Sequence, residues 1–277
     1  MANPIIKWAG GKRQLLPELK NNIPKKYNTY FEPFFGGGAL FFSLNPSVSI
    51  INDSNAQLIN MYNQVKNNAD DLIKILQEIQ NEYNQLSEEE QTDFYYEKRD
   101  VFNHYIKENE LTLNSASIFI FLNKTAFNGL YRTNAKGLFN VPSAHKRKVN
   151  LFDGKNIKEV SKLLKNTKIE NNDFETICKT ASSGDFVFFD SPYFDTFDTY
   201  QANGFSENDH IRLANLFKDL TNKGIYCLAT NSNTDYVKEL YKDFKINIVQ
   251  VKRMINADAN NRTGTEVIIS NRRWMVK

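Results

Sequence analysis

An unbroken apolar run that ends in a carboxylate constrains this chain more than any other feature. Residues 186–195 read FVFFDSPYFD, so four apolar residues are followed at once by Asp190, a serine, a proline and a tyrosine. A short continuous apolar run is typical of a strand that is buried on both faces of a parallel sheet. Open sheets of this type bind ligands at the carboxyl ends of their strands. The run therefore predicts a buried strand that delivers Asp190 to a binding edge.

Strand-like and helix-like segments alternate at both ends of the chain. Strands are expected at 30–34, 47–53, 167–173, 186–190, 225–231, 246–256 and 265–271. Helices are expected between them, and Ser206 with Asp209 forms the capping pattern that starts one of these helices. This alternation predicts an α/β fold with a mostly parallel sheet that is covered by helices on both faces.

Residues 57–155 interrupt the alternation. Apolar residues recur at helical spacing up to about Tyr83, a capping box at Ser87 and Glu90 opens a further helix, and another helix is expected at 114–124. The segment FNGLYRTNAKGLFNVPSAHKRK (127–148) has no clear period and is rich in Asn and Gly, which predicts a loop or hairpin. We therefore expect a discontinuous domain of residues 1–56 and 156–277 with an inserted, mainly helical domain of residues 57–155.

The charge within this insertion changes sign sharply. Residues 67–110 hold 12 acidic and 4 basic side chains, whereas residues 111–152 hold 6 basic side chains and no acidic one. A solvated surface with chance clustering is the alternative, but the complete absence of acids favours a face that binds a polyanion. The basic residues are Lys124, Arg132, Lys136, Lys146, Arg147 and Lys148.

Several classes of protein do not fit the sequence. No run approaches the roughly 20 apolar residues of a membrane span, and the start MANPIIKWAG lacks the features of a secretory signal. Cys178 and Cys227 fit buried free thiols, and three scattered histidines show no metal-ligand spacing. We expect a cytoplasmic protein without a membrane or metal partner.

A glycine-rich turn follows the first strand. FEPFFGGGAL (31–40) runs from a strand through three glycines into a helix, and Asp53 ends the next strand 17 residues after Gly36. Such a turn lets the backbone approach a nucleotide-type ligand, and an acid at the next strand end can accept hydrogen bonds from a ribose. A turn without a ligand, and Asp53 as a helix cap, are the alternatives. KWAGGKR (7–13) is not a phosphate loop, because Ile6 and Arg13 replace the required residues.

The motif DSPY has a chemistry of its own. Pro192 restricts Ser191 to an extended conformation, so the Ser191 carbonyl and the Asp190 carboxylate can point into one small space beside Tyr193. Two acceptors and a flat ring form a receptor for a planar group that carries an amino group. Taken alone, the motif also fits an ordinary Asp-Ser-Pro turn after a strand.

Five motifs together resemble a known family. KWAGGK, FEPFFGGGAL, Asn52-Asp53, NKTAFNGLYRTNAKGLFNVP and DSPY follow one another in the order seen in Dam-like DNA adenine-N6 methyltransferases. The resemblance covers nearly the whole chain, and FNGLYR…GLFNVP is its most specific part. It implies a Rossmann-like methyltransferase sheet with an inserted DNA-recognition domain, and S-adenosylmethionine as the cofactor.

The resemblance also implies roles for individual residues. It implies a catalytic role for Asp190, Ser191, Pro192 and Tyr193. It implies cofactor contacts for Trp8, Lys12, Phe35, Gly36, Gly38, Asp53, Asp173, Phe174 and Asp190. Lys7 and Arg132 match positions that touch the recognition bases, with Asn128 and Tyr131 beside them. The remaining basic residues of the insertion, Lys124, Lys136, Lys146, Arg147 and Lys148, are expected to contact DNA phosphates.

The expected function is methyl transfer from S-adenosylmethionine to the N6 amino group of a flipped adenine in double-stranded DNA, with GATC as the first candidate site. Ser191 stands where the family motif usually has proline, but its backbone carbonyl is the group used, so we expect activity to survive. A catalytically weak DNA-binding module that senses S-adenosylmethionine, and an RNA or protein-amide methyltransferase, are the alternatives. The resemblance leaves room for a cognate restriction endonuclease and for a monomer or weak dimer.

Overall fold

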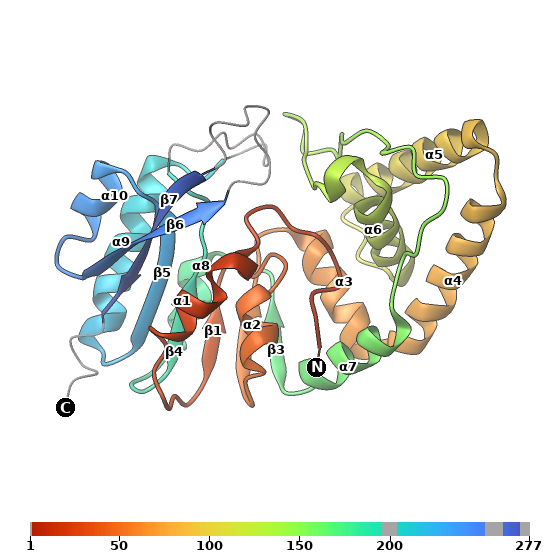
Figure 1. The fold of residues 1–277 in the computed structure, drawn as a ribbon. Coiled ribbons are helices and arrows are strands. Elements are labelled where there is room, and N and C mark those ends of the chain that lie inside the picture. The colour runs from red at the N-terminus through yellow and green to blue at the C-terminus, as the bar shows by residue number, and fades with distance from the viewer. Residues whose placement is uncertain (1, 195–203, 253–262, 272–277) are drawn as a thin grey trace.

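The computed structural model describes residues 2–194, 204–252 and 263–271, and within them the strands form one seven-stranded sheet (Figure 1). The strand order is β3-β2-β1-β4-β5-β7-β6. The first five strands in this order are parallel, whereas β7 runs antiparallel to both β5 and β6. The predicted mostly parallel, Rossmann-like sheet is confirmed. The strands are β1 (Tyr30–Glu32), β2 (Ser49–Asn52), β3 (Thr167–Glu170), β4 (Phe186–Phe189), β5 (Tyr226–Ser232), β6 (Lys245–Lys252) and β7 (Thr263–Ser270).

Helices cover both faces of the sheet because its strands are apolar on both sides. In β4, Phe186 and Phe188 join the core on one face, and Val187 and Phe189 join the core on the other. The first face is covered by η1 (Lys12–Leu15), α1 (Leu16–Lys20), α2 (Ala39–Leu44) and α3 (Ala56–Asn67). The second face is covered by α8 (Phe174–Cys178), α9 (Glu207–Asn222) and α10 (Asp235–Leu240).

A block of helices lies to one side of the sheet (Figure 1). It contains α4 (Ala69–Gln85), α5 (Glu88–Lys107) and α6 (Leu113–Thr125), and α7 (Gly154–Leu164) leads back to the sheet. The helical spacing predicted up to Tyr83 covers two helices, because the backbone leaves the helical conformation at Asn68. The capping boxes predicted at Ser87 and Ser206 are both confirmed. One continuous core joins this block to the sheet, and the domain boundaries at 57 and 155 stay a prediction.

The segment after α6 folds back on itself. It begins with the short helix η2 (Phe127–Gly129), and isolated antiparallel bridges pair Ala126 with Ser143 and Thr133 with Phe139. A turn closes it, where the Asn134 amide donates to the Leu138 carbonyl at 2.9 Å. The predicted loop or hairpin is therefore an irregular hairpin, which we call the recognition hairpin (residues 126–143).

A search of the described residues finds no helix with the length and apolarity that a membrane span requires.

Candidate active site and DNA-facing surface

Asp190 lies at the carboxyl end of β4, where the sequence places it. One carboxylate oxygen accepts a hydrogen bond from the Thr230 hydroxyl of neighbouring β5 at 2.7 Å. The same oxygen is 2.8 Å from the Lys12 ammonium. Lys12 is only 7 % exposed, so it is not a solvated surface lysine. The structure therefore brings the N-terminal segment and the DSPY motif together at one partly buried ion pair.

Tyr193 lies next to this pair. The Lys12 ammonium is 4.7 Å from the centre of its ring, and its hydroxyl donates a 2.7 Å hydrogen bond to Glu266 on β7. Burial, followed by the negative charges of Asp190 and Glu266, raises the pKa of Tyr193 well above its usual value. The tyrosine therefore remains a neutral ring with a fixed orientation, although no sequence pattern pointed to its partner Glu266.

The residue after the motif, Phe194, is held by the end of β5. The Phe194 amide donates to the Asn231 side chain at 2.9 Å, and the Ser232 hydroxyl donates to the Phe194 carbonyl at 2.7 Å. Ser191 is 3 % exposed, and its hydroxyl finds no hydrogen-bond partner in the part of the chain that the structure describes. Pro192 separates Ser191 from Tyr193 and is partly buried. The backbone that follows the motif is thus fixed by β5, whereas Asp190 and Tyr193 are held through their side chains.

Asp53 closes the glycine turn. Its carboxylate accepts one hydrogen bond from the Gly36 amide and one from the Asn55 amide, each at 2.9 Å. Burial raises the pKa of Asp53. Gly36 and Gly38 have φ values of 49° and 65°, in the left-handed region that favours glycine. Asp53 is not the cap of α3, because Asn55 is the N-cap and accepts from the Leu58 amide, and the Asp53 carboxylate keeps further acceptor positions for the predicted ribose contact.

Trp8 covers this turn. A Cβ atom at Gly36 would lie 2.6 Å from the Trp8 ring, so only glycine allows the ring to approach this closely. Tyr131 of the recognition hairpin stacks on Trp8 with ring centres 5.5 Å apart, and the Asn55 side chain hydrogen-bonds its hydroxyl. Burial raises the pKa of Tyr131 to about 12. Tyr131 therefore lies at the glycine turn, and its predicted place beside the DNA bases stays a prediction. The Phe35 ring is buried in the core, with its centre 4.8 Å from the centre of the Tyr62 ring, and its predicted cofactor contact stays a prediction.

A further buried carboxyl group, Glu32, lies beneath the site. It accepts a 2.7 Å hydrogen bond from the Tyr30 hydroxyl. Burial raises the pKa of Glu32 well above its usual value, and the nearby charges of Asp190 and Asp53 raise it further. Glu32 therefore favours its neutral form beside the two carboxyl groups of Asp190 and Asp53. Sequence reasoning missed Glu32, although an acid within an apolar strand was a visible signal. No group of three His, Cys, Asp or Glu among the described residues could hold a metal ion.

Asp173 and Phe174 form the turn between β3 and α8. Asp173 caps α8 and is 2.9 Å from Arg212 of α9. The Arg212 guanidinium lies 4.8 Å from the centre of the Phe174 ring. Phe34 of the glycine turn and Phe205 complete a cluster of three rings around Phe174, with centres 5.2 to 5.9 Å apart. This cluster of mutually tilted rings offers an apolar surface beside the glycine turn.

Lysines gather at the end of α6. A cavity of about 180 Å³ is lined by Lys7, Asn123, Lys124, Lys146, Lys148, Val149 and Asn150. The Lys146 ammonium donates to the Lys124 carbonyl. Burial lowers the pKa of Lys124, and the charges of Lys7, Lys146 and Arg13 lower it further. The cavity is therefore positively charged and suited to an anion such as a phosphate.

The recognition hairpin carries the other predicted DNA contacts. The Arg132 guanidinium donates a 2.9 Å hydrogen bond to Asn140, which fixes its direction. Asn128 is exposed and has a φ of 54°, and the Phe127 ring beside it is 53 % exposed. Lys136 is exposed in the turn of the hairpin. The sequence did not single out Phe127, which is a large exposed aromatic residue between two basic stretches.

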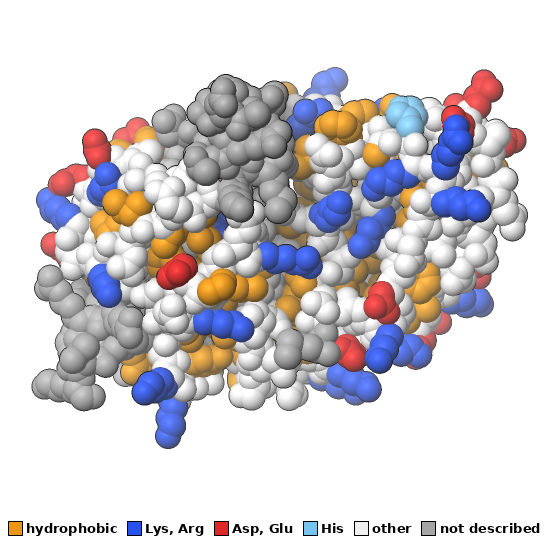
Figure 2. Space-filling view, in the orientation of Figure 1, with side chains coloured by type: hydrophobic (Ala, Val, Ile, Leu, Met, Phe, Trp, Pro, Cys, Tyr) orange, Lys and Arg blue, Asp and Glu red, His pale blue; other side chains and the backbone are white. Residues whose placement is uncertain are grey.

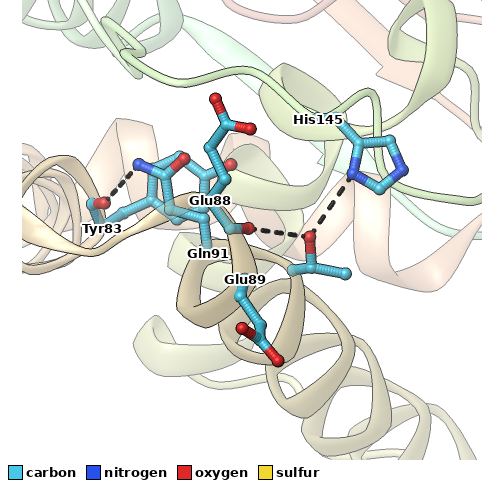
Figure 3. A pocket seen from close by; sticks show the side chains of 6 residues that line it. Tyr83, Glu88, Glu89, Gln91 and His145 are labelled. Carbon is cyan, nitrogen blue, oxygen red and sulfur yellow. Dashed lines mark hydrogen bonds between the residues drawn. The ribbon is translucent and has the colours of Figure 1, made fainter.

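Lysine and arginine side chains are frequent over the helical half of the face seen in Figure 2, and acidic side chains lie mainly at its outer edge. Arg147 differs from the other predicted contacts because it is paired with Glu88 at the start of α5. Its partner Glu88 lines a second cavity, of about 210 Å³, together with Tyr83, Glu89, Gln91, Thr92 and His145 (Figure 3). None of the residues of the DSPY motif lines this cavity.

The chain is similar to known proteins over most of its length. Residues 8–255 match the model of the D12 class N6 adenine-specific DNA methyltransferase family. The chain is 41 % identical over 276 residues to a type II methyltransferase, M1.LlaDCHI of Lactococcus lactis subsp. cremoris, covering 97 % of this chain and 95 % of that protein. It is 41 % identical to type II methyltransferase M.MjaIII of Methanocaldococcus jannaschii, with 94 % of each chain covered.

A more distant relative is the DNA adenine methylase of Haemophilus influenzae, 32 % identical, with 96 % of this chain and 92 % of that protein covered. The matches extend over both the sheet and the inserted helices, so they include the active-site edge and the recognition hairpin together. The chain belongs to the D12 class N6 adenine-specific DNA methyltransferase family.

Proposed function

We propose that this enzyme transfers the methyl group of S-adenosylmethionine to the N6 amino group of an adenine that has left the stack of double-stranded DNA. The observation that carries the proposal is the position of Asp190, at the carboxyl edge of the sheet, paired with Lys12 and next to the partly buried ring of Tyr193. The glycine turn and the basic cavity supply neighbouring surfaces for a nucleoside cofactor and for DNA.

The described residues fit S-adenosylmethionine. Trp8, Gly36 and Asp53 would hold the part of the cofactor near the ribose and methionine, and Asp173 with Phe174 would hold its adenine ring. The Asp53 and Asp190 carboxylates would face its positive charge, whereas Glu32 favours its neutral form because burial raises its pKa. When bound, the cofactor supplies an electrophilic methyl group on sulfur.

The DSPY residues would act on the amino group of the target adenine. The Asp190 carboxylate and the Ser191 carbonyl would accept hydrogen bonds from its two N–H groups. The nitrogen lone pair is conjugated with the adenine ring, and these hydrogen bonds would return electron density to the nitrogen. Tyr193 offers its face to the base. Lys12 and Thr230 both contact Oδ1 of Asp190 in this structure, so the amino group would bind through the other carboxylate oxygen. Positioning of this kind supplies a large part of the rate.

The DNA would lie across the recognition hairpin and the lysine cavity. Lys124, Lys146 and Lys148 would bind phosphates, while Arg132 and Lys7 would read base edges. The exposed Phe127 ring would occupy the space that the flipped base leaves in the stack. GATC remains the first sequence to test, and a restriction endonuclease that cuts the same site would be a natural partner, since two relatives are named as type II methyltransferases.

Transfer of a tritiated methyl group tests the proposal directly. The purified protein is incubated with labelled S-adenosylmethionine and with duplex DNA that contains or lacks GATC, and Asp190→Ala is the control. We expect label in GATC-containing DNA and none above background with Asp190→Ala. No transfer to any DNA by the unmodified protein would contradict the proposal, and transfer to RNA alone would favour an RNA methyltransferase.

A further inference from the structure

The side chain of Asn123, near the end of α6, joins two segments that are far apart in the sequence. Its carbonyl oxygen accepts a hydrogen bond from the Lys7 amide at 2.9 Å. Its amide group donates to the Lys7 carbonyl at 2.8 Å and to the Gly129 carbonyl of the recognition hairpin at 3.0 Å. Asn123 is 4 % exposed. The side chain therefore holds both backbone groups of Lys7 and ties them to the hairpin.

The peptide that Asn123 holds lies between the two proposed binding sites. The Lys7 side chain lines the basic cavity, together with Lys124 and Lys146. Trp8, the next residue, packs on Gly36 of the glycine turn, and Lys12 further along pairs with Asp190. A shift of this segment would therefore move a DNA-side group and cofactor-side groups together.

The contact between Lys7 and Gly129 leaves little room for independent movement. Gly129 has a φ of 67°, and a Cβ atom there would lie 2.8 Å from the Lys7 side chain. A hairpin that closes on DNA must consequently carry the Lys7 backbone with it, because Asn123 and this close approach connect them. Packed segments with such links are the physical basis of coupling between sites.

We propose that Asn123 is a positioning residue that couples DNA binding to cofactor binding through the Lys7–Trp8 peptide. The inference rests on the proposed function for the identity of the two ligands. Because coupling between two binding sites is reciprocal, DNA raises the affinity for cofactor and cofactor raises the affinity for DNA by the same factor. Asn123 borders the basic cavity but is almost fully buried and its side chain bonds to backbone groups, so its removal is expected to affect this factor more than either affinity alone.

The coupling factor is measured without turnover from the equilibrium binding of S-adenosylhomocysteine. The dissociation constant is compared with and without a duplex that contains the site the enzyme methylates. We expect the duplex to tighten binding about fivefold or more in the unmodified protein, and less than about twofold in Asn123→Ala. Asn123→Asp keeps the acceptor for the Lys7 amide but loses both donors, and it should behave like Asn123→Ala. Asn60→Ala is the matched control, since Asn60 is equally buried and bonds to the start of α6 through Thr112 and Ser115.

Trp8 gives a second readout that a loss of stability alone would not change. In a Trp274→Phe background Trp8 is the remaining tryptophan, and we expect cognate DNA to change its emission in the parent protein but not in Asn123→Ala. The melting temperature of each variant is measured alongside.

Equal coupling factors in Asn123→Ala, Asn123→Asp and the parent protein would overturn the inference, as would independent binding of the two ligands to the parent. An equal loss of coupling in Asn60→Ala would also overturn it. Methyl transfer is scored separately, so coupled binding without transfer would contradict the proposed function and leave this inference standing.

Discussion

Ser191 is the residue of the DSPY motif whose side chain has no role in the proposed reaction. Its hydroxyl is buried without a partner among the described residues, and such a group costs about 1–3 kcal/mol. We therefore expect Ser191→Ala to raise the free energy of unfolding by about 1 kcal/mol, and the melting temperature by about 2–4 °C.

Methyl transfer should persist in Ser191→Ala because the proposed acceptor is the backbone carbonyl. Thermal unfolding of the cofactor-free protein, with tritium transfer on the same samples, checks both expectations. A drop in transfer of more than about tenfold, or 1.4 kcal/mol, would show that the hydroxyl itself contacts the substrate.

Asp53 differs from Ser191 because both of its oxygens are already used by the backbone of the glycine turn. Asp53→Ala leaves the Gly36 and Asn55 amides without these partners and removes the predicted ribose ligand. We expect cofactor affinity to fall by about 1–3 kcal/mol, roughly 5- to 150-fold in Kd. Titration calorimetry with S-adenosylhomocysteine measures this decrease, and DNA affinity without cofactor should change much less. Intact cofactor affinity would exclude the ribose role.

At the scale of single elements, α9 holds the β3–α8 turn through Arg212, which pairs with Asp173, Glu175 and Asp209. Arg212 is 40 % exposed, so solvent screens these pairs, and we expect Arg212→Gln to weaken cofactor binding by only about 1 kcal/mol, roughly fivefold. Lys218→Gln on the same helix breaks an exposed pair with Asp243 and serves as the control. Equal effects of the two substitutions on cofactor affinity would argue against a role for Arg212 in placing Asp173 and Phe174.

The elements themselves were largely predictable from the sequence, because their signals are local. The apolar run at 186–189 predicted β4, and Ser87 with Glu90 predicted the start of α5, since strand burial and helix capping depend on a few adjacent residues. The contacts that complete the site were not predictable in this way. Glu266 reaches Tyr193, and Asn123 reaches Lys7, only after distant segments have packed together. No pattern of neighbouring residues encodes such pairs.

For the molecule as a whole, the charged face makes DNA binding depend on pH. Burial lowers the pKa of Lys124 from its ordinary value of 10.5, with nearby Lys7 and Lys146 lowering it further, so its ammonium loses the proton at a lower pH than an exposed lysine would. The protonated form binds phosphate, and DNA affinity should therefore fall as the pH rises toward 10.5 from below. Fluorescence anisotropy with a labelled duplex between pH 7.5 and 10 follows this fall. Lys124→Arg should keep its affinity further into the alkaline range, and identical profiles would exclude Lys124 as the titrating group.

The sign change of charge along the chain predicted a basic face, and the structure shows how the fold divides it. Lys146 and Lys148 line the cavity at the end of α6, whereas the intervening Arg147 is paired with Glu88. The different surroundings of these three neighbouring residues could not be predicted from composition, because they depend on where the start of α5 packs. The three residues are therefore unequal, although the sequence treats them as one basic cluster.

The unequal surroundings of these three residues predict how steeply DNA affinity falls with salt concentration. Removing one lysine–phosphate pair should reduce the slope of log K against log salt concentration by about 0.9. Replacing Lys146, Arg147 and Lys148 together by Gln should lower the slope by roughly 2 rather than 3, because Arg147 is already engaged by Glu88. Lys148→Gln alone should lower it more than Arg147→Gln alone. Lys25→Gln with Lys26→Gln is the matched control, since both precede β1 and lie at the opposite end of the sheet from Asp190. An unchanged slope in the triple variant would remove these residues from the DNA interface and leave the recognition hairpin to supply the phosphate contacts.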